Sequence, residues 1–401
     1  MLKFLIFNRT KVDIMLKTLF LVAFLFTTIG CDTDVSNKSS ISNADKKWEF
    51  EGFEKVDSLN PILNPTKALV FTCPLSNTQV NWEERNVLNP SAVVKENNIY
   101  LFYRAQDISG TSRIGLAISS DGLHFIKSKS PVFYPANDFM KTYEWNFQKF
   151  ADDFVLEDCI NCFDGVEDPR IVESIDGRYI MTYTSYDGKT ARLSIASSAD
   201  LRSWTKHGLV LKDEKYKNHW SKSGAIVVEV KGNQNIAKKI NGKYWMYYGD
   251  TNLFIANSDD LIHWEVCTSA ENEKMISVLY PRAGYFDSRL VEPGPFAIWK
   301  EEGILLIYNG SNAANYNDTN LVKFTYAAGQ ALFDKNEPYK LIDRTDGYFI
   351  HPDKDYEKVG EVNEVCFVEG LVNFKNQWFL YYGTADSKIA VAVNDMSFAN
   401  Q

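Results

Sequence analysis

Hydrophobic and polar residues alternate in short stretches along most of the chain. A period of two residues predicts β-strands that bury one face, and long stretches with the period of a helix are scarce. The predicted strands come in pairs separated by turns rich in Gly, Asn and Asp, at residues 98–104 and 114–125, 177–183 and 191–204, 242–248 and 253–264, 303–308 and 326–333, and 377–382 and 388–393. The pattern therefore predicts an all-β chain.

The strand pairs follow one another as a repeat. Each first strand carries a tyrosine at the same position, and these tyrosines lie 61 to 80 residues apart: Tyr103, Tyr183, Tyr247, Tyr308 and Tyr382. Repeats of about four strands that are arranged radially make a β-propeller. Five repeats predict a five-bladed β-propeller with its functional residues around the central channel. Two β-sandwiches would also explain the strands, but they would not explain the repeat.

The composition is that of a folded, β-rich protein. Of the 401 residues, 45% are hydrophobic, 24% are charged and 14% are aromatic, which excludes a disordered, collagen-like or coiled-coil chain. The net charge is −9, and no run of Lys or Arg supplies the basic face that a nucleic-acid-binding protein needs. We therefore expect no nucleic-acid partner.

The first thirty residues have the pattern of a secretion signal. Basic residues precede an apolar run at 18–30 that is too short for a comfortable membrane span. The run ends in Thr-Ile-Gly-Cys31, which resembles the lipobox of bacterial lipoproteins, where the cysteine is lipidated. We expect a lipoprotein signal peptide at 1–30, a flexible tether at 31–50 and the propeller domain at 51–401. Cys31 would anchor the chain in the bacterial cell envelope, at the periplasmic or outer-membrane face; an ordinary secretory peptide or an anchor helix is the alternative.

The remaining cysteines and histidines give no pattern of a metal site. Cys159 and Cys162 form one Cys-x-x-Cys pair, but no second pair or His pair completes a zinc site. In an exported protein this pair forms either a local disulfide or two free thiols. No metal and no cofactor are expected.

The segment Gly165-Val-Glu-Asp-Pro-Arg170 is the strongest candidate for chemistry. Taken alone, an acidic pair before a proline and an arginine is equally well explained as a charged turn. Its context changes that balance, because Asn89-Pro-Ser opens the first repeat and Tyr103-Arg-Ala and Ser112-Arg-Ile-Gly follow it.

Together these motifs resemble glycoside hydrolase family 130, the mannoside phosphorylases and mannosidases, which have a five-bladed propeller. The similarity runs from about Asn89 to Val393. It implies that Asp168 is the catalytic acid, which protonates the leaving group through a hydroxyl of the sugar. The positions that it implies for the sugar and anion pocket are Asn89, Arg104, Arg113, Arg170 and Asp386.

Three positions depart from the family's phosphorylases. Glu292 stands where a glycine is usual, Glu364 replaces an asparagine, and Asn309 replaces a histidine. Two added carboxylates repel a phosphate dianion in a dry cleft, whereas a carboxylate can accept a proton from attacking water. These departures resemble the hydrolytic branch of the family, in which a pair of glutamates activates water.

Several cations remain near the predicted site. Arg104, Arg170 and Lys222 remain, and the resemblance implies that cations near these positions hold phosphate in phosphorylases; the same cations can equally pair with Asp168, Glu292 and Glu364, because buried carboxylates need such partners. Export favours hydrolysis, because a sugar phosphate released outside the cytoplasm would not enter metabolism. Trp220, in a loop near Lys222, is a candidate for stacking on a sugar ring.

We therefore expect an inverting, exo-acting β-mannosidase whose substrate is a mannose-containing oligosaccharide. The resemblance implies a β-1,2 linkage, with Asp168 as the acid and with Glu292 and Glu364 as a close pair that activates water. The first alternative is a β-mannoside phosphorylase that uses inorganic phosphate and releases mannose 1-phosphate. The second is a surface lipoprotein that binds glycans without cleaving them. The membrane is expected to be a partner only through the lipid anchor, and the sequence does not indicate an oligomeric state.

Overall fold

The computed structural model describes residues 48–150 and 163–395, and this part of the chain is almost entirely β-structure. The helical elements are single turns: α1 (Lys141–Glu144), α2 (Asp355–Lys358) and a 3-10 turn at Phe147–Phe150. The prediction of an all-β chain is confirmed. In the described residues no helix is long and apolar enough to cross a membrane. The predicted signal peptide, Cys31 and the pair Cys159 and Cys162 lie outside these residues.

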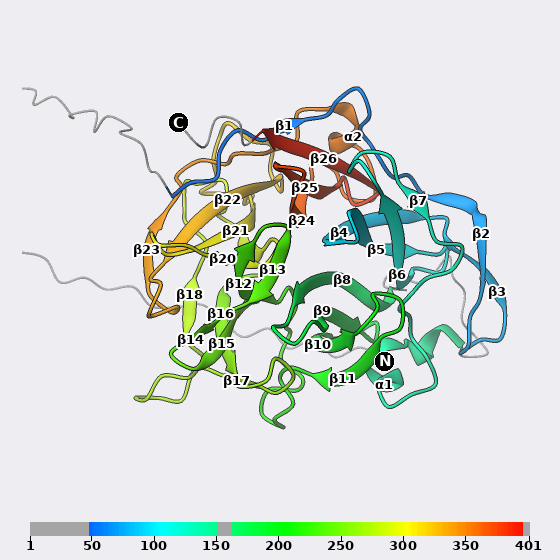
Figure 1. Ribbon diagram of the computed structural model, residues 1–401, viewed down its shortest axis with the longest axis horizontal. Helices are drawn as coiled ribbons and strands as arrows, with labels where there is room; N and C mark the ends of the chain where they lie inside the picture. Colours follow the sequence, from blue (N-terminus) through cyan, green and yellow to red (C-terminus); the bar gives the residue numbers. More distant parts are fainter. Residues whose placement is uncertain (1–47, 151–162, 396–401) are drawn as a thin grey trace, which may run out of the picture. The chain divides into compact units, whose positions relative to one another are not determined.

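The strands form successive antiparallel groups, each named here after its first strand (Figure 1). The β4 group contains β4 (Asn86–Lys95), β5 (Asn98–Gln106), β6 (Thr111–Ser119) and β7 (Ile126–Lys127). The β8 group contains β8 (Asp164–Glu173), β9 (Tyr179–Tyr186), β10 (Ala191–Ser198) and β11 (Thr205–Leu209). The β12 group contains β12 (Ala225–Lys231), β13 (Gln234–Ala237), β14 (Lys239–Ile240), β15 (Lys243–Tyr248), β16 (Leu253–Ser258), β17 (Trp264–Val266) and β18 (Ser277–Leu279).

Two further groups complete the series. The β19 group contains β19 (Leu290–Pro293), β20 (Ala297–Trp299), β21 (Ile304–Ser311), β22 (Tyr326–Phe333) and β23 (Leu341–Arg344). The β24 group contains β24 (Cys366–Phe374), β25 (Gln377–Thr384) and β26 (Lys388–Asp395), and β1 (Glu54–Lys55) pairs with β26. β2 (Thr66–Thr72) and β3 (Gln79–Glu83) form a separate two-stranded ribbon.

Neighbouring groups are joined by short stretches of parallel pairing. β6 pairs in parallel with the start of β8, and β12 pairs in parallel with β20. Figure 1 shows β4, β8, β12 and β24, the first strands of four groups, nearest to the middle of the strand arrangement. Residues at corresponding positions of these first strands are therefore brought toward one another. The five-bladed propeller itself stays a prediction.

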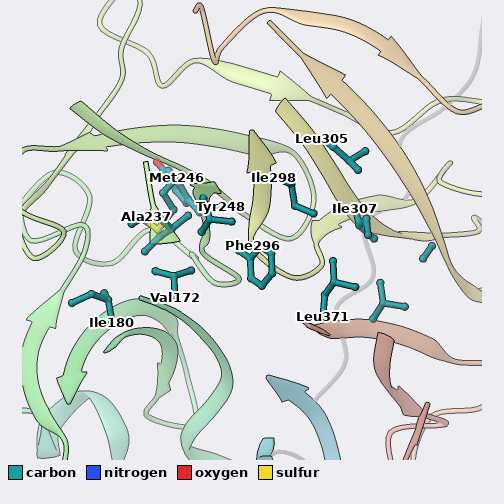
Figure 2. Packing of buried hydrophobic residues seen from close by; sticks show 14 of the residues in the cluster. Val172, Ile180, Ala237, Met246, Tyr248, Phe296, Ile298, Leu305, Ile307 and Leu371 are labelled. Atoms are coloured by element: carbon teal, nitrogen blue, oxygen red, sulfur yellow. The ribbon is translucent and has the colours of Figure 1, made fainter. Parts of the chain in front are cut away.

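The hydrophobic core runs between the groups. Figure 2 shows Phe296 packed among side chains from other groups, including Val172 of β8, Tyr248 of β15 and Leu371 of β24. All of these side chains are buried, and such burial is the main contribution to the stability of a fold. The core thus fixes the spacing of the first strands, which carry the candidate site.

Four of the five repeated tyrosines donate a hydrogen bond to a buried carboxylate. The Tyr103 hydroxyl donates a 2.7 Å hydrogen bond to Glu83, and Lys127 of the outer strand β7 forms a 2.6 Å ion pair with the same carboxylate. The same arrangement, a second-strand tyrosine, a buried carboxylate and an outer-strand cation, occurs in three other groups: Tyr183–Glu144–Lys206, Tyr308–Asp287–Arg344 and Tyr382–Glu357–Lys55. Tyr247 instead donates to the backbone carbonyl of Pro338 at 2.7 Å. These contacts between tyrosine, carboxylate and cation connect the inner and outer strands of a group.

The Ser-x-Asp segments of the sequence repeat are turns. The Ser198 hydroxyl accepts hydrogen bonds from the backbone N–H groups of Asp200 and Leu201, and the Asp200 carboxylate accepts from the two following N–H groups. Ser119 with Asp121 and Ser258 with Asp260 repeat these contacts. Trp264, which follows the third turn, is buried against the core, consistent with a packing role.

Candidate active site

Three of the candidate residues occupy one position of the repeat. Asn89 on β4, Asp168 on β8 and Glu292 on β19 each stand immediately before a proline of a first strand. In the β4 and β19 groups that proline pairs with the repeated tyrosine of the second strand: Pro90 with Tyr103, and Pro293 with Tyr308. In β8 the corresponding proline falls in the bulge opposite Tyr183. This shared position explains why residues more than 200 positions apart in sequence approach one another.

The backbone at Asn89 and Asp168 has an uncommon conformation. Their φ angles are 47° and 49°, and the pairing register shifts at both residues. Positive φ is uncommon for residues other than glycine and is retained where the surrounding structure enforces it, often at functional sites. A bulge also changes the direction of a side chain relative to a regular strand. Here the two side chains meet, and Asn89 Nδ2 donates a 2.8 Å hydrogen bond to Asp168 Oδ1.

Asp168 is buried among cations. Its side chain is 1% exposed, Arg104 Nη1 lies 3.3 Å from Oδ1, and Lys222 Nζ lies 3.8 Å from Oδ2. Burial alone would raise the pKa of Asp168, but Arg104, Lys222 and the hydrogen bond from Asn89 outweigh it and lower the pKa. In the free protein Asp168 is therefore an ionised carboxylate. It can act as an acid only after it has taken up a proton, which requires that bound substrate weakens the influence of these cations.

Glu167, the neighbour of Asp168, belongs to the same cluster. Arg104 Nη2 lies 2.6 Å from its carboxylate, and the Ser112 hydroxyl donates a 3.1 Å hydrogen bond to it. Burial, together with the charge of Asp168, raises the pKa of Glu167 to about 7 despite Arg104. Sequence analysis singled out only the second residue of this acidic pair. The register supplies the missing signal, because the bulge brings both side chains to the same cluster.

Glu292 and Asp168 are linked through Lys222. Lys222 Nζ lies 3.1 Å from Glu292 Oε1, and the Ser223 hydroxyl donates a hydrogen bond to the same oxygen. Glu292 is 3% exposed, and its burial raises its pKa even though Lys222 acts in the opposite direction. A carboxylate with a raised pKa is a stronger base toward water than an exposed glutamate. The single positive charge of Lys222 therefore interacts with both candidate carboxylates, those of Asp168 and Glu292.

Arg170 connects three first strands. Its Nε and Nη2 each donate a 2.7 Å hydrogen bond to the carbonyls of Gly294 and Pro293, and Nη1 donates a 3.3 Å hydrogen bond to the Asp168 carbonyl. The same Nη1 lies 2.6 Å from Oε1 of Glu369 on β24. Arg170 therefore fixes the backbones of both Asp168 and the strand that carries Glu292.

Glu369 is a member of the cluster that sequence analysis did not find. Its side chain is fully buried, and it lies where the register between β24 and β25 shifts. Burial raises its pKa well above the ordinary value; Arg170 opposes this, whereas the charges of Asp168 and Glu292 add to it. The available signal was a single acidic residue inside the apolar strand sequence Cys-Phe-Val-Glu-Gly-Leu-Val.

Glu364 lies at a different place. Its side chain is half-buried, its φ is 60°, and its carbonyl accepts a 2.9 Å hydrogen bond from the backbone of Tyr326. In the part of the chain that the structure describes, its carboxylate forms no ion pair or hydrogen bond with Glu292 or Asp168. Glu369 of the same segment is the glutamate on which the charges of Asp168 and Glu292 act. A water-activating role for Glu364 stays a prediction.

Asp386 lies near the cluster, whereas Arg113 is not brought to it. Burial raises the pKa of Asp386 to about 6, opposed by Arg104 and Lys222 and reinforced by the charge of Asp168. Arg113 is buried against Asp107, with Nη1 2.7 Å from the carboxylate. Adjacent residues of a strand point to opposite faces. Ser112 faces Arg104 and Glu167, so Arg113 faces away from them.

The cluster can perform acid–base chemistry but does not resemble a metal site. Five carboxylates, those of Glu167, Asp168, Glu292, Glu369 and Asp386, surround the three cations Arg104, Arg170 and Lys222. Within residues 48–150 and 163–395 no group of three or more His, Cys, Asp or Glu side chains could hold a metal ion. The pKa values of the carboxylates are displaced in both directions, which is typical of catalytic clusters.

Comparison with known proteins gives one family over nearly the whole described chain. The model of glycoside hydrolase family 130, described as beta-1,4-mannooligosaccharide phosphorylase, matches residues 54–400. A beta-1,2-mannobiose phosphorylase of Thermoanaerobacter sp. is 30% identical over 84% of this chain and 95% of its own length. The 1,2-beta-oligomannan phosphorylase of the same organism is also 30% identical, over 79% of this chain and 92% of its own length.

Solved structures are more similar in sequence. A glycosyl hydrolase from Bacteroides ovatus is 43% identical, with a TM-score of 0.81, and the match covers 88% of this chain and 96% of that one. A structure from work on family 130 glycoside hydrolases that target beta-1,2 mannosidic linkages in Candida mannan is 42% identical, with a TM-score of 0.81 and the same coverage. The similarity therefore includes proteins described as phosphorylases and proteins described as hydrolases.

Proposed function

Because the chain belongs to glycoside hydrolase family 130, we propose that it is an inverting, exo-acting β-mannosidase that hydrolyses β-1,2-linked mannosides. Members of this family act on mannosidic linkages either with phosphate or with water. The choice between these two attackers depends on what surrounds the acid, because phosphate needs cations whereas water needs a base.

The observation that carries the proposal is the pairing of the cations. Arg104 lies 2.6 Å from Glu167, Lys222 lies 3.1 Å from Glu292, and Arg170 lies 2.6 Å from Glu369. A phosphate dianion that entered this cluster would have to displace carboxylates from their partners and would meet uncompensated negative charge. Water meets no such barrier, and the carboxylates supply candidate bases.

The proposed roles follow from the positions. Asp168 is the acid: once it has taken up a proton in the substrate complex, it passes that proton to a hydroxyl of the sugar, which gives its own proton to the leaving oxygen. Glu292 accepts the proton of the attacking water, and its raised pKa suits that task. Glu364 is the second member of the proposed glutamate pair. Asn89, Arg104, Arg170, Lys222 and Asp386 hold the sugar and the carboxylates, whereas Arg113, which pairs with Asp107 away from the cluster, has no role in this proposal.

Phosphorolysis is the second candidate function, and Arg289 favours it. Its guanidinium lies 5.8 Å from the ring centre of Tyr326. Burial and the charge of Glu292 raise the pKa of the Tyr326 hydroxyl, whereas Arg289 and Lys222 act in the opposite direction. In the described part of the chain Arg289 forms no ion pair with a carboxylate, so it could receive an anion at the edge of the cluster. The curated relatives described above are also phosphorylases.

The test is a comparison with and without phosphate. Purified protein is incubated with β-1,2-mannobiose in phosphate-free buffer and in phosphate buffer, and the sugars are followed by NMR. We expect mannose in both buffers. Turnover in phosphate buffer alone, yielding mannose 1-phosphate, would establish the phosphorylase. The anomer is followed on methyl β-mannoside, whose leaving group contributes no mannose: inversion yields α-mannose first, and early β-mannose would contradict it.

Two further proposals concern the whole chain. The five-bladed propeller is supported by the five successive strand groups and by the β1–β26 pairing, which joins the beginning of the described chain to its last strand. Anchoring in the cell envelope through Cys31 is supported by the lipobox-like sequence alone. Metabolic labelling with an azido fatty acid, compared between the wild type and Cys31→Ala, tests the anchor.

A further inference from the structure

A pocket of about 450 Å³ lies beside the carboxylate cluster. It is lined by residues of two segments, His219 and Trp220 on one side and Gly249–Asn252 on the other, together with Phe254. Its volume is in the range of sites that hold small molecules, and it combines aromatic rings with a few polar groups. None of these residues was needed for the roles proposed at Asp168 and Glu292.

The pocket is joined by hydrogen bonds to Lys222 and to β19, the strand of Glu292. The Gly249 N–H donates a 2.9 Å hydrogen bond to the carbonyl of Lys222, the residue that bridges the two carboxylates. On the other side the N–H of Val291, next to Glu292, donates a 3.2 Å hydrogen bond to the Thr251 carbonyl. The turn between them needs glycine, because φ at Gly249 is 129° and a Cβ there would lie 2.2 Å from the Asn252 carbonyl oxygen. The pocket wall therefore has a fixed position relative to the reacting centre.

Trp220 is an exposed ring that is held in place. It is 46% exposed, yet its Nε1 donates a 2.6 Å hydrogen bond to Asp250 Oδ2, and Tyr186 packs edge-on with ring centres 6.1 Å apart. An exposed aromatic surface is costly to leave in water and gains by packing against an apolar partner. The C–H face of a pyranose ring is such a partner, and its hydroxyls bond to polar groups around the ring.

The polar groups of the pocket suit sugar hydroxyls. Asp250 accepts hydrogen bonds, and the side chain of Asn252 can both donate and accept them. Burial lowers the pKa of His219, so that its imidazole is neutral near pH 7 and presents one donor and one acceptor. The pocket offers no paired cations for a phosphate and no deep apolar cavity for a lipid chain.

We propose that this pocket binds the sugar of the leaving group, with Trp220 as its stacking platform; the proposal rests on the proposed glycosidase function. The catalytic carboxylates are buried, as the terminal sugar of an exo-acting enzyme requires, whereas Trp220 is open to solvent. The part of the substrate beyond the cleaved bond therefore extends toward Trp220. The pocket makes the enzyme selective for mannosides whose leaving group is itself a sugar ring.

The test compares two leaving groups in two variants. Trp220→Ala removes the platform, and Trp220→Phe keeps a ring but loses the hydrogen bond to Asp250. On β-1,2-mannobiose we expect Trp220→Ala to lower kcat/KM about tenfold or more, mainly through KM, and Trp220→Phe to lower it less. On methyl β-mannoside, whose leaving group has no ring, both variants should match the wild type. Phe139→Ala, which removes another exposed aromatic ring far along the chain from the pocket, is the matched control.

The outcomes separate this proposal from the proposed function. Equal losses on both substrates, or no loss on the disaccharide, would overturn the subsite while leaving the glycosidase in place. A wild type that cleaves no β-mannoside would overturn the function itself. To cover slow turnover, binding of mannose and mannobiose is measured by calorimetry in Asp168→Asn and in Asp168→Asn/Trp220→Ala. The subsite requires that the second substitution weakens mannobiose binding and leaves mannose binding unchanged.

Discussion

The side-chain amide of Asn89 donates a 2.8 Å hydrogen bond to the carboxylate of Asp168, across 79 residues of sequence. Both residues have positive φ, both stand before a proline, and both lie in a register shift of a first strand. The same local irregularity, repeated in two strand groups, thus places an amide donor on the candidate acid. Glu292 occupies the corresponding position in the β19 group and reaches the same cluster through Lys222.

Asp168→Asn should lose nearly all activity on β-mannosides while folding normally. The substituted amide can still accept the hydrogen bond from Asn89 through its oxygen, so the geometry is retained, but it cannot supply a proton. Initial rates on β-1,2-mannobiose and thermal denaturation, measured on the same preparation, check both parts. An active Asp168→Asn enzyme would remove Asp168 from the role of acid.

Glu292→Gln should lower kcat about 10²- to 10⁴-fold, the usual contribution of a general base. External azide, which needs no base, should restore part of the turnover and yield α-mannosyl azide. Glu364→Gln is the comparison, because Glu364 is half-buried and is not in contact with Lys222. If both glutamates activate water, the two variants will show similar losses and similar rescue. If only Glu292 does, Glu364→Gln will retain most of its activity, and the pair is wrong.

Glu369→Gln should change the pH dependence of stability. Burial raises the folded-state pKa of Glu369 well above its unfolded value. Between these two pKa values the folded state therefore binds more protons than the unfolded state. The unfolding free energy of the wild type therefore falls over this range, and the neutral glutamine does not contribute to that fall. Urea denaturation at pH 5 and pH 8 should show a smaller loss of stability for the variant. An equal loss in both proteins would show that Glu369 is ionised without cost in the folded state.

The hydrogen bonds of the repeated tyrosines predict unequal losses of unfolding free energy for the same Tyr→Phe substitution. Tyr103→Phe removes a hydrogen bond to the buried carboxylate of Glu83 and leaves Lys127 as its partner, whereas Tyr247→Phe removes a hydrogen bond to a neutral carbonyl. Hydrogen bonds to charged groups contribute about 1.5–3 kcal/mol and neutral ones about 0.5–1.5 kcal/mol. We expect Tyr103→Phe to be the more destabilising in urea denaturation, and the reverse order would contradict a structural role for the carboxylates.

The sequence indicated the strands and part of the site for physical reasons that also explain the omissions. Alternation along the chain shows strands because burial of one face is local information, and the motifs around Asp168 and Arg170 show chemistry because their neighbours are adjacent in sequence. Glu369 and Glu167 were missed because their roles depend on register shifts that bring a strand residue to the cluster. Arg113 was included because the family resemblance implied it, and the resemblance does not say which face of β6 its side chain takes; its ion pair with Asp107 places it on the face away from the cluster.

Lys222→Met should move the pH profile of activity to higher pH. Lys222 lowers the pKa values of both Asp168 and Glu292, so removing its charge raises both. Because the pKa of Asp168 is the lower of the two, the acidic limb of the kcat/KM profile follows Asp168 and the alkaline limb follows Glu292, and both limbs move to higher pH. An opposite charge at this distance shifts a pKa by about 1–3 units, so both limbs should move by about one unit or more. Lys222→Arg, which keeps the charge, is the control and should leave both limbs in place. A phosphorylase would respond differently: Lys222→Met would raise the KM for phosphate at every pH, and that result would favour the second candidate function.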